Sequence, residues 1–352
     1  MTAGDGARET GLGRAAAPAV AVVGCGAIAK MRHVPVLAER PEVRERLVLV
    51  DQDLDRARAL AHAFGVASVA ADYRDVLGKV DGVVIALPHH LHFRVALDCL
   101  RAGVHVLCEK PLAESAAEVA ELLAAAEQSH VALAVNNTRR LFPPSRRVHE
   151  LLSEGAIGAV RFLGYYDGTK YEWPSASGFA FGLRGTRKGV LLDVGAHVLD
   201  LVCWWLGRQP QVTAYTDDSF GGSEAVAKLS FTDGVTHGEV HLSWLAKLRN
   251  GFRVEGEAGS IVGSVYDWHA VELVSRSGKR KRIPLNSGIR TSGDLGRLVV
   301  KNFLDVIQSR RPPLVSGRDV APSIAMIEAC YARRHRFEMP WHDDWERIRY
   351  AL

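Results

Sequence analysis

The stretch AVAVVGCGAIA, residues 19–29, decides the fold class of this chain of 352 residues. Its first five residues are apolar and predict a buried strand, and the glycines at 24 and 26 predict a tight turn into a helix. Ala29 is the third small residue of the pattern and lets the helix pack closely on the strand. Such a turn typically holds the phosphates of a dinucleotide at the helix N-terminus, although a purely structural turn can have the same residues.

The following hundred residues alternate short apolar runs with helical stretches. Continuous Val, Ile and Leu strands separated by helices indicate a parallel sheet that is covered on both faces. Residues 18–138 are therefore predicted to form a Rossmann-type dinucleotide-binding domain. We expect its strands at 19–23, 47–50, 82–87, 104–107 and 131–135, and its helices at 29–38, 54–64, 92–102 and 115–128.

After residue 138 the rhythm changes to runs of strands without helices between them, which favour a largely antiparallel sheet. Residues 139–352 are therefore predicted to form a second α/β domain. We expect its helices at 144–153, 190–206, 295–309 and 318–336, and its strands at 160–166, 211–216, 224–232, 235–245, 251–256 and 260–274.

Composition limits the classes of function. Apolar residues make up 47% and charged residues 24% of the sequence, as in ordinary soluble globular proteins. The net charge is only +4 and the basic residues are scattered along the chain, so we expect no nucleic-acid partner. No run reaches the roughly 20 apolar residues that span a bilayer, so we expect no membrane segment. Five cysteines without regular spacing suggest neither a disulfide framework nor a zinc site, and they fit a reducing cytoplasm.

The N-terminal residues allow two interpretations. Residues 1–17 are rich in small residues and are predicted to be a disordered leader. Residues 15–29 are uncharged, follow Arg14 and end in Ala-Ile-Ala, so they resemble a signal peptide. We favour the strand and glycine turn, because cleavage there would delete the first strand of the sheet.

Asp51 ends the second predicted strand, where a carboxylate can accept hydrogen bonds from the adenosine ribose and repel a 2′-phosphate. No arginine follows immediately, because Gln52 and Asp53 come next. The sequence therefore favours NAD over NADP as the cofactor, with NADP left open.

Lys110 lies in His105-Val-Leu-Cys-Glu-Lys-Pro111, where an apolar strand ends and a proline prevents its continuation. The carboxyl ends of such strands border the crevice in which ligands bind. We therefore expect Lys110 to contact both substrate and cofactor.

Asp193 and His197 are four residues apart on an otherwise apolar predicted helix, so they share one face. An imidazole exchanges a proton near neutral pH, and a nearby carboxylate can orient it. We interpret the pair as proton-transfer machinery, with a simple pairing on the helix surface as the alternative.

At this point the chain resembles the Gfo/Idh/MocA oxidoreductases, which include glucose–fructose oxidoreductase and inositol 2-dehydrogenase. The resemblance covers most of residues 19–340. It is carried by VVGCGAIA (22–29), ALPHHLH (86–92), GVHVLCEKPLA (103–113), NNTRRLFP (136–143), EGAIGAVRF (154–162) and LLDVGAHVLDL (191–201).

The resemblance implies a Rossmann domain followed by an α/β domain whose large, mostly antiparallel open sheet joins subunits into a homodimer or homotetramer. It also implies catalytic roles for three residues. His197 exchanges a proton with the substrate oxygen, Lys110 hydrogen-bonds that oxygen and helps place the nicotinamide, and Asp193 positions substrate and histidine.

Two departures from the family pattern affect the site. The family commonly has Thr-Pro-Asn where this chain has Leu87-Pro88-His89, so contacts to the nicotinamide ribose are expected to differ. Arg187 and Lys188 replace the usual glycines, and they either contact an anionic substrate or belong to a solvated loop, which we favour. The histidines at 89, 90 and 92 lack acidic or cysteine partners nearby, so we expect no metal.

The hypothesis is an NAD(P)-dependent enzyme that moves hydride between nicotinamide and a secondary alcohol or ketone of a sugar, cyclitol or sugar derivative. The alternatives are a redox-cycling epimerase or glycosidase of the same family and a non-catalytic cofactor-binding regulatory protein. Aromatic residues 165–179 either line the sugar pocket or pack in the core. We expect cofactor contacts from Gly24, Gly26, Ala27, Ile28, Asp51, Gln52, Leu87, Pro88, His89, His92, Glu109, Lys110 and Asn137. We expect substrate contacts from Lys110, Arg139, Tyr166, Trp173, Asp193 and His197.

Overall fold

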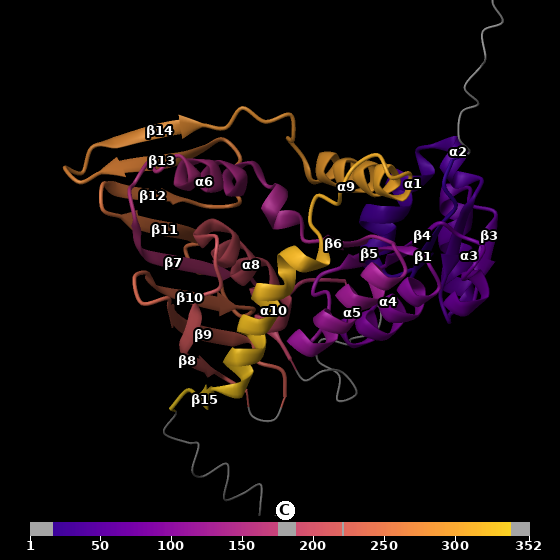
Figure 1. Ribbon diagram of the computed structural model, residues 1–352, viewed down its shortest axis with the longest axis horizontal. Helices are drawn as coiled ribbons and strands as arrows, with labels where there is room; N and C mark the ends of the chain where they lie inside the picture. The colour runs from indigo at the N-terminus through magenta and orange to yellow at the C-terminus, as the bar shows by residue number, and fades with distance from the viewer. Residues whose placement is uncertain (1–16, 175–187, 220–221, 339–352) are drawn as a thin grey trace, which may run out of the picture.

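The computed structural model describes residues 17–174, 188–219 and 222–338, which form two sheets with helices between them (Figure 1). The predicted leader lies almost wholly outside these residues. None of the described helices is both long and apolar enough to cross a bilayer.

The first sheet confirms the predicted parallel Rossmann arrangement, with β1 at its centre between β2 and β4. All five pairings are parallel, so the carboxyl ends of the strands meet along one edge. The strand order is β3 (Ser68–Ala70), β2 (Leu47–Val50), β1 (Val20–Val23), β4 (Gly82–Ile85), β5 (His105–Glu109) and β6 (Leu133–Asn136). The edge strand β3 was not predicted, because only three residues form it and none of them is buried.

The first predicted helix consists of two parts. Residues Ala29–His33 form a π-helical turn, η1, and Val34–Ala38 continue as α1. Pro35 has no backbone N–H to donate to the preceding turn, which gives a physical reason for the altered hydrogen bonding. The remaining helices of this half are α2 (Pro41–Arg44), α3 (Leu54–Phe64), η2 (Tyr73–Val76), η3 (His89–Leu91), α4 (His92–Arg101) and α5 (Ala116–Gln128).

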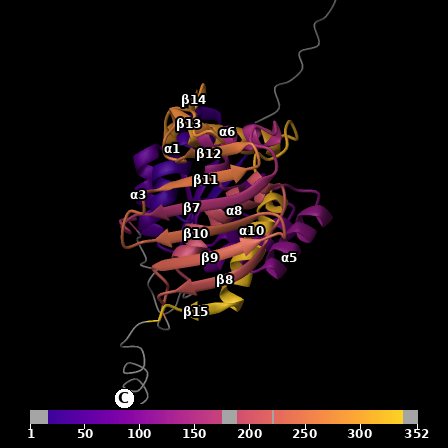
Figure 2. The ribbon, with the colours of Figure 1, turned by 90° about the vertical axis from the view of Figure 1, so that its left-hand side faces the viewer.

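The second sheet is mostly antiparallel, as predicted, with parallel pairings only between β10 and β7 and between β15 and β8 among the described strands. Helices cover one face, and Figure 2 looks onto the other, over which no described helix lies. The order is β14 (Arg280–Pro284), β13 (Ala270–Ser275), β12 (Gly259–Gly263), β11 (Gly251–Gly256), β7 (Val160–Gly168), β10 (His237–Ser243), β9 (Val226–Thr232), β8 (Gln211–Asp217) and β15 (Arg334–Arg336).

Several predicted elements are divided in the structure. The helix expected over 190–206 consists of α7 (Val190–Asp193) and α8 (Gly195–Leu206), and the strand expected over 260–274 is the β12–β13 pair. The last helix, α10, ends at Ala332 instead of residue 336, because residues 334–336 pair with β8. Helices η4 (Thr138–Leu141) and α6 (Pro143–Ser153) join the two halves.

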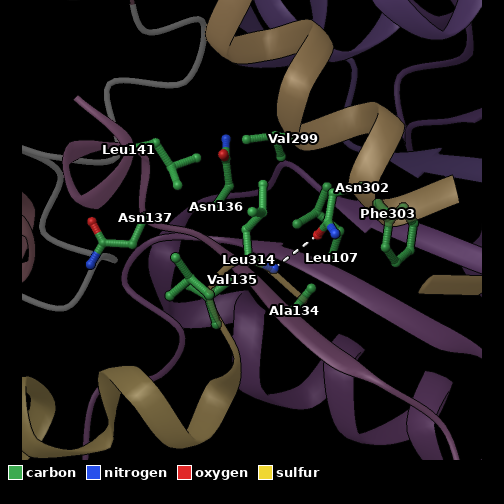
Figure 3. A pocket seen from close by; sticks show the side chains of 11 residues that line it. Leu107, Ala134, Val135, Asn136, Asn137, Leu141, Val299, Asn302, Phe303 and Leu314 are labelled. Carbon is green, nitrogen blue, oxygen red and sulfur yellow. Dashed lines mark hydrogen bonds between the residues drawn. The ribbon is translucent and has the colours of Figure 1, made fainter. Parts of the chain in front are cut away.

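Helix α9 (Ser292–Ile307) lies in the segment assigned to the second domain but packs into the core of the first. Its buried face includes Leu295, Val300 and Phe303, which share a hydrophobic cluster with strand β1. The approach is close, because a Cβ on Gly82 of β4 would lie 2.5 Å from the Cδ1 atom of Ile307. Figure 3 shows side chains of α9 beside those of β5 and β6.

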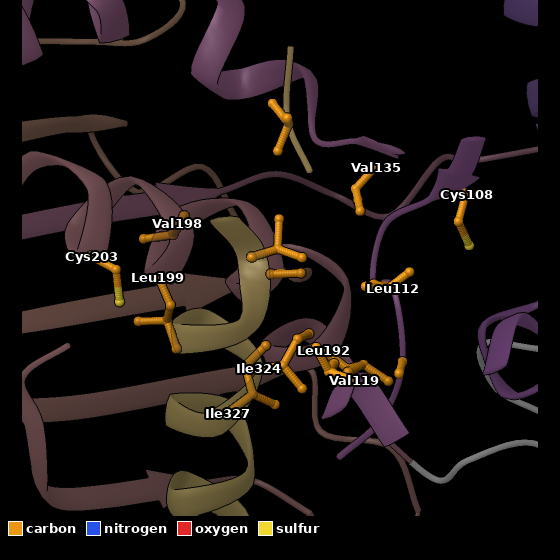
Figure 4. Close-up of a cluster of buried hydrophobic side chains, with 14 of the residues drawn as sticks. Cys108, Leu112, Val119, Val135, Leu192, Val198, Leu199, Cys203, Ile324 and Ile327 are labelled. Atoms are coloured by element: carbon orange, nitrogen blue, oxygen red, sulfur yellow. The ribbon is translucent and has the colours of Figure 1, made fainter. Parts of the chain in front are cut away.

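Helix α10 (Gly317–Ala332) packs against both halves of the molecule. Ile324 and Ile327 belong to one cluster with Leu192 of α7 and Leu199 of α8, and with Leu112, two residues beyond Lys110 (Figure 4). The segments that carry Lys110, Asp193 and His197 are therefore braced by the same apolar core.

Candidate active site

A cleft of about 1100 Å³ runs between the two sheets, along the carboxyl edge of the first. The glycine turn and Asp51 line one part, and Lys110, Asp193 and His197 line another. The edge predicted to bind ligands therefore faces the predicted proton-transfer residues.

The glycine turn fits a dinucleotide. Gly24 has φ +97°, and a Cβ there would lie 2.4 Å from the carbonyl oxygen of Ala86, so only glycine fits without strain. At Gly26 a Cβ would meet nothing within 4 Å, because this backbone faces the cleft. Ala27 and Ile28 line the cleft directly after it. A pyrophosphate can approach this backbone as the glycine pattern requires.

Asp51 is buried and joins the end of β2 to the glycine turn. Its Oδ2 atom accepts the backbone N–H of Cys25 at 2.9 Å, and Oδ1 accepts that of Asp53 at 2.9 Å. Arg56 lies 3.2 Å from both carboxylate oxygens, and it lines the cleft with Asp51 and Gln52. Arg56 was not predicted because it does not directly follow Asp51 in the sequence. It lies in the first turn of α3, which begins at Leu54, and its guanidinium reaches back to Asp51.

Lys110 and Asp193 form an ion pair across the cleft. The Lys110 ammonium donates to Oδ1 of Asp193 and, at 3.0 Å, to its backbone oxygen. Burial opposes ionisation of Asp193, but the nearby Lys110 charge outweighs it and lowers the pKa of the carboxyl. The carboxylate is therefore charged and fixes the direction of the Lys110 side chain.

His197 takes its orientation from Asn137, and the prediction that Asp193 orients it is wrong. The Nδ1 atom of His197 lies 2.5 Å from Oδ1 of Asn137, while Asp193 pairs with Lys110. The helix breaks at Val194, between the two predicted partners. With Nδ1–H donated to the amide oxygen, Nε2 keeps its lone pair for a proton. Burial, Lys110 and Arg139 hold the pKa of His197 well below its usual range.

Asn137 therefore has a different place from the one predicted for it. It is 2% exposed, does not line the large cleft, and its Nδ2 atom lies 3.4 Å from the Ala196 oxygen. Figure 3 shows Asn136 and Asn137 pointing in different directions from the end of β6. Asn137 therefore contacts His197 and is not among the residues that line the cleft.

Glu109 lines the cleft beside Lys110 and is held by two neighbours. His33 places Nε2 at 2.7 Å from Oε1 of Glu109, and Asn136 donates to the same oxygen at 2.6 Å. Burial opposes the charge of Glu109, but His33 and Asn136 together lower its pKa. The Glu109 carboxylate is therefore held in one position beside Lys110 in the cleft.

Of the four residues at 87–92 that were predicted to contact the cofactor, Leu87, Pro88 and His89 line the cleft and His92 does not. His92 is fully buried, with ring nitrogens 2.7 Å from the Pro111 oxygen and 2.8 Å from the Leu87 oxygen. It ties the two cofactor-side loops together. Burial and the nearby Lys110 lower the pKa of His89 to about 3, so its imidazole is neutral.

Two of the remaining predicted substrate residues, Arg139 and Trp173, line the cleft, whereas Tyr166 of β7 does not. Arg139 lines the cleft and pairs with Asp167, and Trp173 lines it while 41% exposed. Tyr166 does not line it, because side chains alternate along the strand and Tyr165 takes the inward position. Tyr166 donates to Glu239 on the open face, so the structure does not bring this predicted substrate residue to the cleft.

Of the two cations that replace the usual glycines, only Lys188 lies among the described residues. Lys188 lines the cleft and donates to the Glu114 carboxylate at 3.1 Å, whereas Arg187 and Phe179 lie outside the described residues. Among the described residues, no three His, Cys, Asp or Glu side chains are grouped to hold a metal ion.

Two family models match the chain. The model described as an oxidoreductase family with an NAD-binding Rossmann fold matches residues 19–137, and that of the GFO/IDH/MocA C-terminal domain matches residues 145–262.

Relatives extend the similarity over most of the chain. The 1,5-anhydro-D-fructose reductase of Ensifer adhaerens is 26% identical over 333 residues, covering 88% of this chain and 95% of the relative. The trans-1,2-dihydrobenzene-1,2-diol dehydrogenase of Mus musculus is 30% identical over 270 residues, covering 75% of this chain and 79% of the relative. KijD10, a 3-ketoreductase from Actinomadura kijaniata solved with NADP and TDP-benzene, shares the fold with a TM-score of 0.76. That likeness has 22% identity and covers 91% of this chain and 99% of that one.

Proposed function

The chain belongs to the GFO/IDH/MocA family of NAD-binding oxidoreductases, and from that premise we propose that it interconverts a secondary alcohol and a ketone on a sugar or cyclitol. The observation that carries the proposal is the convergence of Lys110, Asp193 and His197 in the cleft that the glycine turn borders. When bound, the nicotinamide cofactor supplies the hydride acceptor or donor.

Proton transfer falls to His197 in this proposal. Removal of hydride from a carbinol requires a base on the hydroxyl, and Nε2 of a neutral imidazole supplies one. Asn137 holds Nδ1 and so keeps the lone pair on Nε2. The depressed pKa of His197 keeps it neutral at physiological pH.

Lys110 orients the reacting oxygen. Its ammonium has three donors, of which two contact Asp193, so one remains for a substrate oxygen. A cation there stabilises the negative charge that develops on that oxygen. Asp193 aims the lysine and does not itself carry the proton.

NAD is the cofactor that the described residues favour. The Asp51 carboxylate faces the cleft near the glycine turn and can accept the ribose hydroxyls. Arg56 beside it partly offsets the repulsion of a 2′-phosphate, which keeps NADP within reach.

A sugar-type substrate is proposed because the relative from Ensifer adhaerens is named for a sugar ketone. The test is to incubate the protein with a panel of sugars and cyclitols at saturating NAD or NADH. Hydride transfer is measured as the change in NADH absorbance. Turnover that disappears in His197→Gln supports the proposal. Product formation from sugars without any net change in NADH would instead assign redox-cycling epimerisation or glycoside cleavage.

Two further parts of the proposal concern assembly and location. The uncovered face of the second sheet is proposed to join subunits into a homodimer or homotetramer, which light scattering would detect (Figure 2). A cytoplasmic location is proposed because all five cysteines are unpaired and buried. Fractionation of cells expressing a tagged chain tests it.

A further inference from the structure

Arg32 is a cation that lines the cleft and has no side-chain partner among the described residues. It lies half-buried in η1 and lines the cleft, yet no described residue forms a hydrogen bond or ion pair with its side chain. The buried acidic residues that line the cleft have other partners: Asp51 pairs with Arg56, Glu109 with His33 and Asn136, and Asp193 with Lys110. A half-buried guanidinium costs free energy unless an anion meets it.

Contacts of its neighbour and of its own backbone fix where Arg32 lies in the fold. Its neighbour His33 bonds to Glu109, the residue that precedes Lys110. On the other side, a Cβ on Gly296 would lie 3.7 Å from the Arg32 backbone oxygen, so η1 rests against α9. Figure 1 shows α9 beside α1, the helix that continues η1. The backbone of Arg32 therefore lies against α9, and the next residue in the chain contacts Glu109 of the cleft.

An apolar wall continues from α9 along the cleft. Phe142 and Trp268 line it with ring centroids 5.1 Å apart, at an interplanar angle of 61°. The Trp268 indole donates to the Val265 oxygen at 3.0 Å, which fixes the ring. Leu295 and Val299 line the same wall, and all four side chains pack on one cluster.

We propose that Arg32 binds a phosphate group carried by the substrate, so that the site takes a phosphorylated or nucleoside-diphosphate-linked sugar. The inference rests on the proposed function and names its substrate class. A guanidinium presents paired donors that match phosphate oxygens. The phosphates of the cofactor have their own donors at the glycine turn. The Phe142–Trp268 wall offers a flat apolar surface on which a nucleobase can pack.

The test compares Arg32→Gln with Lys30→Gln in full-length protein saturated with NADH. Lys30 is an exposed cation of the same turn that does not line the cleft, so it controls for the loss of charge. Calorimetry measures the binding of inorganic pyrophosphate, uridine diphosphate and thymidine diphosphate. We expect Arg32→Gln to weaken binding by roughly 10- to 100-fold, and Lys30→Gln by less than about threefold. The Kd for NADH and the melting temperature should stay unchanged in both.

The three probes distinguish the two sources of phosphate. Equal binding of pyrophosphate and the nucleotides identifies a sugar phosphate. Tighter nucleotide binding that Trp268→Ala removes identifies a nucleoside-diphosphate sugar. Either outcome supports Arg32 as the phosphate ligand when Arg32→Gln weakens the binding, and unchanged binding in that variant would contradict it.

Three results would overturn the inference. One is the absence of binding by all three probes to the wild-type complex with NADH. Another is a weaker NADH affinity in Arg32→Gln with unchanged probe binding, which would assign Arg32 to the cofactor. The third is turnover of uncharged sugars with equal KM in wild type and Arg32→Gln, with no gain from phosphorylated sugars. The proposed function fails separately, if no sugar of either kind exchanges hydride with the cofactor.

Discussion

His197 and Asn137 face each other at 2.5 Å although 60 residues of sequence separate them. The amide oxygen, being neutral, orients the imidazole without stabilising its charged form. A carboxylate in the same place would hold the same proton and favour imidazolium.

Asn137→Asp should therefore move the acid limb of the kcat/KM profile for alcohol oxidation to higher pH. Asn137→Leu, which only removes the acceptor, should lower kcat by roughly 10- to 100-fold without such a shift. Steady-state rates from pH 5 to 9 measure both. Identical profiles in the wild type and Asn137→Asp would show that His197 is not the titrating base.

The wild-type profile follows from the low pKa of His197. A base must be neutral to accept a proton, and burial beside Lys110 and Arg139 keeps this imidazole neutral below its ordinary pKa of 6.5. The kcat/KM for oxidation should therefore stay level as pH falls to 6.5 and decline only below it. A decline that begins above pH 7 would point to another group.

Lys110→Met should lower kcat by roughly 10²–10³-fold, because it removes the cation beside the developing oxyanion. His197→Gln should cost roughly 10²–10⁴-fold. The double variant should be little worse than the poorer single variant, because both act in one step. Turnover that survives in the double variant would remove both residues from the mechanism.

Alanine substitutions at the two glycines of the turn should have different effects, one on stability and the other on NAD binding. Gly24→Ala places a Cβ against the Ala86 oxygen at positive φ, which should cost about 1–3 kcal/mol and lower the melting temperature by roughly 1–4 °C. Gly26→Ala meets no protein atom, so stability should hold while NAD binding weakens. Thermal melts of the apoprotein and NAD titrations separate the effects. Equal NAD affinity in Gly26→Ala would place the pyrophosphate elsewhere.

Cofactor choice should depend on the balance between Asp51 and Arg56. Wild type should prefer NAD, and Asp51→Ser should raise NADP affinity by roughly tenfold, because Arg56 then faces the 2′-phosphate without a competing carboxylate. Arg56→Ala in the Asp51→Ser background should reverse that gain. The measurement is Kd for both cofactors, and a tenfold wild-type preference for NADP would contradict the role of Asp51.

The strands of the first sheet were predictable because buried parallel strands are continuous apolar runs. The carboxyl edge, and with it Asp51 and Lys110, followed from that topology. The faces of β7 did not follow, because alternation places Tyr165 and Tyr166 on opposite sides without saying which side meets the cleft. Helix packing decided it.

Partners in the site were harder to predict than positions. Spacing of four residues suggested that Asp193 orients His197, but a helix break and the nearby Lys110 gave each a different partner. Asn137 has no local signal, because its contact with His197 exists only after β6 and α8 pack together. Arg56 had a signal in its position in the first turn of α3, a helix that begins three residues after Asp51.

Helix α9 restricts how far the two halves of the molecule can move apart. The chain leaves the first sheet after β6, builds most of the second sheet and then returns to lay α9 against η1. Three covalent connections therefore join the halves, after β6, before α9 and through α10 to β15. A wide hinge opening would have to separate the apolar helix α9 from the first core. Exchange of cofactor and product should proceed by small sliding movements of packed helices. A fragment ending at residue 138 would expose to water the apolar surface that α9 covers. We therefore expect the dinucleotide-binding half to be insoluble when it is expressed alone.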